Sequence, residues 1–171
     1  SVVAESLETS PLVNAISFTG SVATGRAIAA RCVASGKKVQ LEMGGKNPMV
    51  VLDDADLDVA VEACINGAFF STGQRCTASS RLIVTEGIHD RFVEAMKARM
   101  VTLKIGDALA AETHIGPVVD AKQLQQDEDY IRIAREEGGE VFGGERVPGA
   151  SKGYFLAPAL ITGTNNAMRI N

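Results

Sequence analysis

The sequence has few cysteines and no long apolar run, and these absences restrict what the protein can be. Its 171 residues include three cysteines, an odd number that argues against a disulfide framework and for reduced thiols. No apolar run approaches the roughly 18 residues of a membrane span, and the first ten residues lack the charged and hydrophobic regions of a signal peptide. We therefore expect a cytoplasmic protein that makes no membrane contact.

The charged and metal-binding residues give no sign of two other classes of partner. Lys and Arg number 17 against 21 Asp and Glu, for a net charge of -4, and the two signs are interspersed along the chain. Because nucleic-acid surfaces concentrate positive charge, no nucleic-acid partner is expected. The two histidines and three scattered cysteines never fall at zinc-ligand spacing, so no metal site is expected either.

Strand-like and helix-like segments alternate along the chain. Strands are expected over 13–19, 37–42, 49–53, 81–85, 140–145 and 155–162, and helices over 22–35, 56–70, 89–103 and 118–137. Such alternation predicts an α/β fold with a mostly parallel sheet flanked by helices. The first strand is rich in β-branched and aromatic residues, which predicts that it is buried.

Apolar residues at helical spacing predict which helix faces turn inward. The expected inward positions are Leu57, Val61, Ile65 and Phe69 on one helix, Phe92, Met96, Met100 and Leu103 on a second, and a row through Val22, Arg26, Ala29, Ala30 and Val33 on a third. Cys32 and Cys64 lie beside these apolar positions, so both are expected to fill the core.

Cys76 lies in a different environment, the polar segment STGQRCTASSR. Unreactive cysteines behave as small hydrophobes and are usually buried, so this one is either a nucleophile or an accident of the loop. The neighbouring Arg75 could favour a thiolate. His89 and His114 show no motif that would pair them with the cysteine, which disfavours a Cys/His protease.

Two glycine-containing turns follow predicted strands. FTGSVATG, residues 18–25, joins a strand to a helix, and such a junction suits a phosphate, although a plain strand-to-helix turn is the simpler interpretation of these residues alone. It is not a P-loop, because Arg26 follows Gly25. In LEMGGKNP, Glu42 ends a strand before two glycines, at the sheet edge where α/β folds bind ligands. Glu42 is either a general base for water or a solvated glutamate.

Taken together, FTGSVATG, LEMGGKNP and STGQRCTASSR, which follow one another in that order along the chain, resemble the aldehyde dehydrogenase superfamily. The resemblance extends over the whole chain, including DDADLDVAV, IGP at 115–117 and GYFLAP at 153–158. Family chains are much longer, so this one resembles an internal fragment. The resemblance implies that residues 1–44 end a Rossmann-like cofactor-binding domain and that residues 45–171 form part of an α/β catalytic domain.

The resemblance also implies a role for individual residues. Cys76 is the expected nucleophile and Glu42 the expected general base. The expected cofactor contacts are Gly20, Ser21 and Gly25 at the pyrophosphate, Gly44 near the nicotinamide, and Gln123 at a ribose. The family commonly has a lysine three residues after this glutamine, where the present chain has Gln126.

The implied reaction is oxidation of an aldehyde to a carboxylic acid with NAD or NADP, through a cysteine thiohemiacetal and a thioester. Arg75 and Thr77 flank the nucleophile, and an arginine there can pair with a distal carboxylate, which favours a dicarboxylic semialdehyde as substrate. Because several family parts are missing, we expect the 171 residues alone to be inactive. The alternative is a non-catalytic folded or oligomerisation module of a homo-oligomeric parent.

Overall fold

Two α/β units make up the chain, Ser1–Gly45 and Lys46–Asn171. The computed structural model describes residues 2–148 and 152–171. The division after Gly45 lies next to the domain boundary expected from the sequence, between residues 44 and 45. The assignment of the two units to cofactor binding and catalysis stays a prediction.

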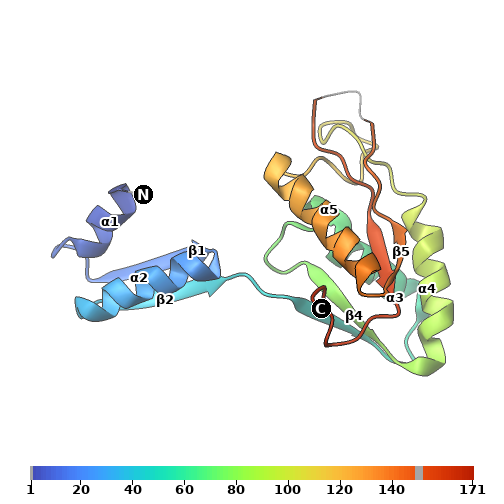
Figure 1. Cartoon of the computed structure of the whole chain (residues 1–171), viewed down its shortest axis with the longest axis horizontal. Coiled ribbons are helices and arrows are strands. Elements are labelled where there is room, and N and C mark those ends of the chain that lie inside the picture. The colour runs from blue at the N-terminus through green and yellow to red at the C-terminus, as the bar shows by residue number, and fades with distance from the viewer. Residues whose placement is uncertain (1, 149–151) are drawn as a thin grey trace. The chain divides into compact units, whose positions relative to one another are not determined.

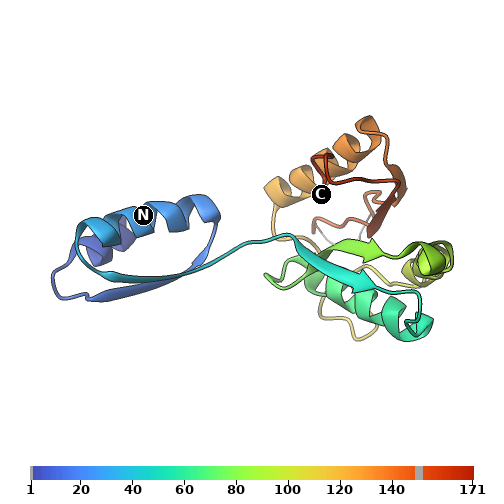
Figure 2. The ribbon, with the colours of Figure 1, turned by 90° about the horizontal axis from the view of Figure 1, so that it is seen from below.

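The N-terminal unit is a β–α–β arrangement preceded by one helix. Its elements are α1 Val2–Thr9, β1 Ala15–Gly20, α2 Val22–Ala34 and β2 Lys38–Met43. The two strands pair in parallel, and α2 covers one face of the pair (Figure 2). Because the other face is uncovered within this unit, β1 alternates between half-buried and exposed residues. The expectation of a buried first strand is therefore wrong for this chain.

Two further features of this unit differ from the sequence-based expectations. The sequence predicts no helix or strand before residue 13, but the structure has α1 there, at Val2–Thr9. Glu8 of α1 is buried (3% exposed) and forms an ion pair with Arg31 of α2. The hydrogen bond from Arg31 lowers the pKa of Glu8. The inward face of α2 is also not the predicted one, since Gly25, Ile28 and Cys32 are buried while Val33 is 74% exposed.

The C-terminal unit contains the remaining elements (Figure 1). They are β3 Asn47–Val51, α3 Leu57–Phe69, the 3-10 helix η1 Phe70–Gly73, β4 Ser79–Val84, α4 Glu86–Met100, α5 Ala121–Glu136, β5 Glu140–Gly143 and β6 Ala159–Thr162. Strands β3 and β4 pair in parallel and β5 and β6 antiparallel, so two of the three strand pairs among the described residues are parallel. The predicted α/β fold is confirmed, with three separate pairs in place of one continuous sheet.

The core of the C-terminal unit forms where α3 and α4 pack together beside β3 and β4. Its buried members are Val51, Val61, Cys64, Ile65, Ile88, Phe92, Met96, Met100, Leu103 and Ile115, with Leu57 and Phe69 partly buried against them. The inward faces predicted for these two helices are thus confirmed. Cys32 and Cys64 are both fully buried, also as predicted. Within the described part of the chain, no helix combines the length and apolar character needed to cross a bilayer.

Replacing Ile65 by Ala should lower the free energy of unfolding by about 2–5 kcal/mol, because it removes buried methyl groups and leaves a cavity. The matched control is Val59→Ala on the same helix, where the side chain is 67% exposed and the change should stay within about 0.5 kcal/mol. Urea unfolding followed by circular dichroism measures both. Equal effects of the two variants would contradict the packing described here.

Candidate active site

The loop that carries Cys76 begins with an abrupt turn at the end of α3. Ser71 and Thr72 both have φ of 55°, and Gly73 has φ of 64°. Among the described residues, Ser71 and Thr72 are the only non-glycine residues with positive φ, a conformation that is rare outside glycine. A Cβ at Gly73 would lie 2.6 Å from the carbonyl oxygen of Ala68, so this position requires glycine. Strained backbone of this kind persists only where surrounding contacts hold it.

Two amide side chains hold the loop in place. The Nδ2 of Asn47, at the start of β3, donates hydrogen bonds to the carbonyl oxygens of Cys76 at 2.7 Å and Ala78 at 3.1 Å. The Oε1 of Gln74 accepts one from the backbone N–H of Val119, at 3.1 Å. The loop is therefore fixed both to β3 and to the segment that precedes α5.

Cys76 differs from the other two cysteines in its accessibility. It is exposed, and its backbone N–H has no hydrogen-bond partner among the described residues. Cys64 is fully buried with its Sγ 2.9 Å from the Sδ of Met49, and burial raises the pKa of the Cys64 thiol to about 11. Of the three thiols, the structure leaves Cys76 open to a reagent, beside an N–H that is free to bind an oxyanion.

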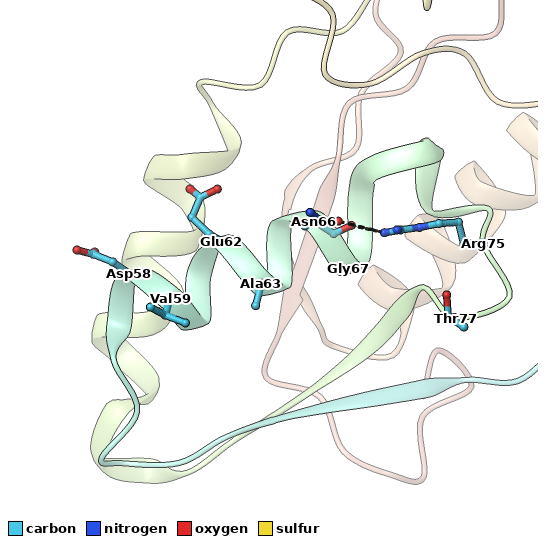
Figure 3. Close-up of a pocket in the computed structure, with 8 residues that line it drawn as sticks. All are labelled: Asp58, Val59, Glu62, Ala63, Asn66, Gly67, Arg75 and Thr77. Carbon is cyan, nitrogen blue, oxygen red and sulfur yellow. Dashed lines mark hydrogen bonds between the residues drawn. The ribbon is translucent and has the colours of Figure 1, made fainter.

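Arg75 and Thr77 line an open pocket of about 720 Å³ along α3 (Figure 3). The guanidinium of Arg75 donates from Nη2 to the carbonyl oxygen of Asn66 at 2.5 Å. This bond satisfies a carbonyl group in the last turn of α3, where a positive charge also stabilises the helix. Nη2 also donates a longer hydrogen bond to Oδ1 of Asn66, at 3.4 Å. Nε and Nη1 of Arg75 make no hydrogen bond within the described residues, so their N–H groups stay available to a ligand.

The charges that line this pocket are separated along α3. Asp58 and Glu62 lie toward the beginning of the helix, and Arg75 lies beyond its end (Figure 3). Glu62 is held by Arg99, whose Nε donates to Oε1 at 2.5 Å, and this hydrogen bond lowers the pKa of Glu62. The cationic end of the pocket is therefore the end next to the Cys76 loop.

In the N-terminal unit, strand register brings the glycine turn and Glu42 to one edge. The parallel pairing sets Thr19 opposite Glu42 and Gly20 opposite Met43. The chain then turns at Ser21, whose Oγ caps α2 by accepting a hydrogen bond from the N–H of Thr24 at 3.3 Å. Glu42 is exposed at this edge, next to the exposed first turn of α2.

The glycines at this edge differ in what a side chain at each position would contact. A Cβ at Gly25 would lie 2.6 Å from the Sδ of Met43, and one at Gly20 would lie 2.6 Å from the ring of Phe18. A side chain at either position would therefore displace the end of Met43 or the ring of Phe18, whether or not a phosphate lies above them. Gly44 has nothing within 4 Å of its Cβ direction, so packing in this chain gives no reason for a glycine there.

Gln123 lies in the first turn of α5, where Asp120 caps the helix. Its Nε2 donates to Oδ1 of Asp127 at 2.7 Å. Burial raises the pKa of Asp127, and the hydrogen bond from Gln123 opposes that rise. The amide nitrogen expected to reach a ribose is therefore engaged within α5, while Gln126 is exposed. A ribose contact by Gln123 stays a prediction.

The structure also shows functional residues that sequence reasoning missed. Asn47 lies in the turn that the sequence predicts within the segment LEMGGKNP, yet its side chain fixes the backbone at Cys76. One sequence feature indicates this contact: Asn47 is a polar residue at the start of β3, and β3 pairs with β4, the strand that follows the Cys76 loop. The left-handed turn at Ser71 and Thr72 had no such signal, since neither residue type favours positive φ.

The family model for the aldehyde dehydrogenase family matches residues 1–171. The chain is 44% identical to an α-ketoglutaric semialdehyde dehydrogenase of Bacillus subtilis over 99% of this chain and 36% of that protein. It is 40% identical to a betaine aldehyde dehydrogenase of the same organism, over 98% of this chain and 35% of that one. The chain thus spans about a third of the length of these relatives.

Solved structures agree with this match. An NADP-dependent enzyme of E. coli superimposes with a TM-score of 0.92 at 38% identity, over 98% of this chain and 35% of that one. A betaine aldehyde dehydrogenase of Staphylococcus aureus in complex with NAD⁺ gives a TM-score of 0.91 at 34% identity, over 98% and 34%. The chain belongs to the aldehyde dehydrogenase family.

Of the three thiols, Cys76 should react first. With an alkylating reagent such as iodoacetamide near pH 8, we expect one thiol per native chain to be modified rapidly, because Cys32 and Cys64 are fully buried and the raised pKa of Cys64 keeps its thiol protonated. Mass spectrometry of tryptic peptides identifies the modified residue. Cys76→Ser should remove the fast phase, and labelling of Cys64 at a rate equal to that of Cys76 would contradict this view of the loop.

Proposed function

We propose that this chain is the nucleophile-bearing part of an NAD(P)-dependent enzyme that oxidises an aldehyde to a carboxylic acid. The observation that carries the proposal is the exposed Cys76 thiol in a loop held by Asn47, beside an unpartnered backbone N–H. Membership of the aldehyde dehydrogenase family supports it.

The chemistry assigns separate tasks to three groups. The Cys76 thiolate adds to the aldehyde carbon, and the Cys76 N–H stabilises the oxyanion of the resulting thiohemiacetal. NAD or NADP, when bound, supplies the acceptor for the hydride that leaves this carbon. Glu42 then takes a proton from the water that attacks the thioester, and the acid is released as the sulfur departs. Sulfur suits both halves, because it is a strong nucleophile and a good leaving group.

The N-terminal unit has features that fit the phosphates of such a cofactor. The first turn of α2 is exposed and directly follows the Gly20–Ser21 turn. The N–H groups of Val22 and Ala23 have no hydrogen-bond partner among the described residues, so they and the positive helix end are open to an anion. We assign Gly20, Ser21 and Gly25 to this contact, Gly44 to the region of the nicotinamide and Gln123 to a ribose. NAD and NADP both remain candidates, since one structural neighbour is NADP-dependent and another holds NAD⁺.

We further propose that residues 1–44 end the cofactor-binding domain and that residues 45–171 belong to the catalytic domain of a cytoplasmic homo-oligomer. The substrate that we favour is a semialdehyde with a distal carboxylate. Arg75 supports this choice, since its free N–H groups lie at the end of the α3 pocket next to the Cys76 loop. Similarity to an α-ketoglutaric semialdehyde dehydrogenase supports it as well.

In a longer polypeptide that contains this chain, Glu42→Gln should lower steady-state turnover by about 10²- to 10⁴-fold, because deacylation loses its general base. The first burst of reduced cofactor should persist, and Cys76→Ser should abolish it. Stopped-flow absorbance at 340 nm measures both phases, with the exposed Glu112→Gln as matched control.

The 171 residues alone should show no turnover. If the 171-residue chain does turn over an aldehyde, and Cys76→Ser abolishes that turnover, this expectation is wrong. If Glu42→Gln and Cys76→Ser both keep full activity in the longer polypeptide, the chain is a non-catalytic module.

Arg75→Gln should raise KM for an aldehyde with a terminal carboxylate by about tenfold, since a charge-assisted hydrogen bond is lost. KM for an uncharged aldehyde of equal length should change little. Both constants come from initial rates in the same longer polypeptide, with betaine aldehyde as a cationic comparison. An equal change for all three aldehydes would show that Arg75 acts only by holding the end of α3.

A further inference from the structure

A second pocket, of about 300 Å³, is lined by two cationic side chains and by no acidic side chain among the described residues. It is lined by residues of β4, α5 and β6, together with Lys46 before β3 and Asn171. Its polar lining includes the cations Lys46 and Arg81 and the hydroxyl groups of Ser80 and Thr164, and no Asp or Glu among the described residues lines it. None of its lining residues belongs to the pocket beside Cys76, so the two pockets are distinct.

The two cations are held near one another by strand pairing. The partner of Arg81 in the β3–β4 ladder is Pro48, two residues after Lys46. A register shift between Asn47 and Pro48 leaves Ser80 without a partner residue in the ladder. Burial lowers the pKa of Lys46, and the nearby positive charge of Arg81 lowers it further. Like charges therefore face the same pocket, an arrangement that is unfavourable until an anion joins it.

Other arginines in the chain show the usual solution to such a charge. Arg31, Arg99, Arg132 and Arg146 each form an ion pair with a carboxylate. Arg81 instead donates to a neutral group, the Oδ1 of Asn166, at 2.8 Å. Lys46 makes no ion pair within the described residues either. Both cations of this pocket therefore lie there without a carboxylate partner among the residues that the structure describes.

We propose that Lys46 and Arg81, with the hydroxyl groups of Ser80 and Thr164, form a binding site for an oxyanion, either a carboxylate or a phosphate. A guanidinium presents its N–H groups as a planar fork that matches such an anion, and an ammonium adds a second charge at close range. The hydroxyl groups can donate to the remaining oxygens. The anion comes either from solution or from a side-chain carboxylate in a longer parent polypeptide.

The probe for this site is inorganic phosphate at constant ionic strength. In the 171-residue chain with its C-terminus amidated, so that no carboxylate of Asn171 competes, phosphate should raise the midpoint of thermal unfolding. It should also slow the acetylation of Lys46 by acetic anhydride, as quantified by mass spectrometry. Lys46→Gln and Arg81→Gln should each weaken the apparent phosphate affinity by about tenfold, whereas Lys122→Gln, which removes an exposed charge elsewhere, should not. Arg81→Lys should retain part of the response.

The same measurements on a longer polypeptide that contains this chain distinguish the two sources. If the anion comes from solution, the longer protein responds to phosphate as the short chain does. If a side-chain carboxylate occupies the site, Lys46 is already protected without phosphate, and added phosphate changes nothing. The proposal is overturned if the phosphate response survives Lys46→Gln and Arg81→Gln. It is equally overturned if neither protein shows a response or protection of Lys46. Because Glu42 and Cys76 lie outside this pocket, either result leaves the proposed reaction to its own test.

Discussion

The paired hydrogen bonds from Asn47 to the carbonyl oxygens of Cys76 and Ala78 are the constraint on which the candidate site depends. Without them, Gln74 and Arg75 would still hold the start of the loop, but no side-chain hydrogen bond would fix the backbone at Cys76 itself. The bonds use the carbonyl group of Cys76 and leave its N–H without a partner among the described residues. One amide thus fixes the backbone of the residue whose thiol and N–H carry the proposed reaction.

Parallel pairing plays the corresponding part in the N-terminal unit. Because β1 and β2 run in the same direction and in register, the turn after Gly20 and the carboxylate of Glu42 reach one edge together. No side chain needs to bridge them for this to happen. The backbone ladder sets their separation, and Ser21 then starts α2 by capping it, which fixes the direction of its first N–H groups.

The sequence allowed most of the fold and part of the site to be predicted. Periodicity was sufficient for α3 and α4, where Ile65, Phe92 and Met96 are fully buried as expected. It failed for α2, because alanines give a weak pattern and a glycine, Gly25, proved to be among the residues of the inward face. It also missed α1, whose position depends on the ion pair between Glu8 and Arg31, 23 residues apart. The exposed Cys76 was recognisable from its polar neighbours. The Asn47 contact was not, since it depends on the pairing of two strands.

The contact between Met43 and Gly25 has a consequence for how this chain can change over time. The sulfur of Met43 occupies the space that a side chain at position 25 would need, so these two residues share one contact between α2 and β2. Met43 directly follows Glu42 in the same strand. A larger residue at either position would move the start of α2 relative to the carboxylate, and a smaller residue at 43 would allow alanine at 25. The two positions therefore form a size-matched pair that should vary together among related chains.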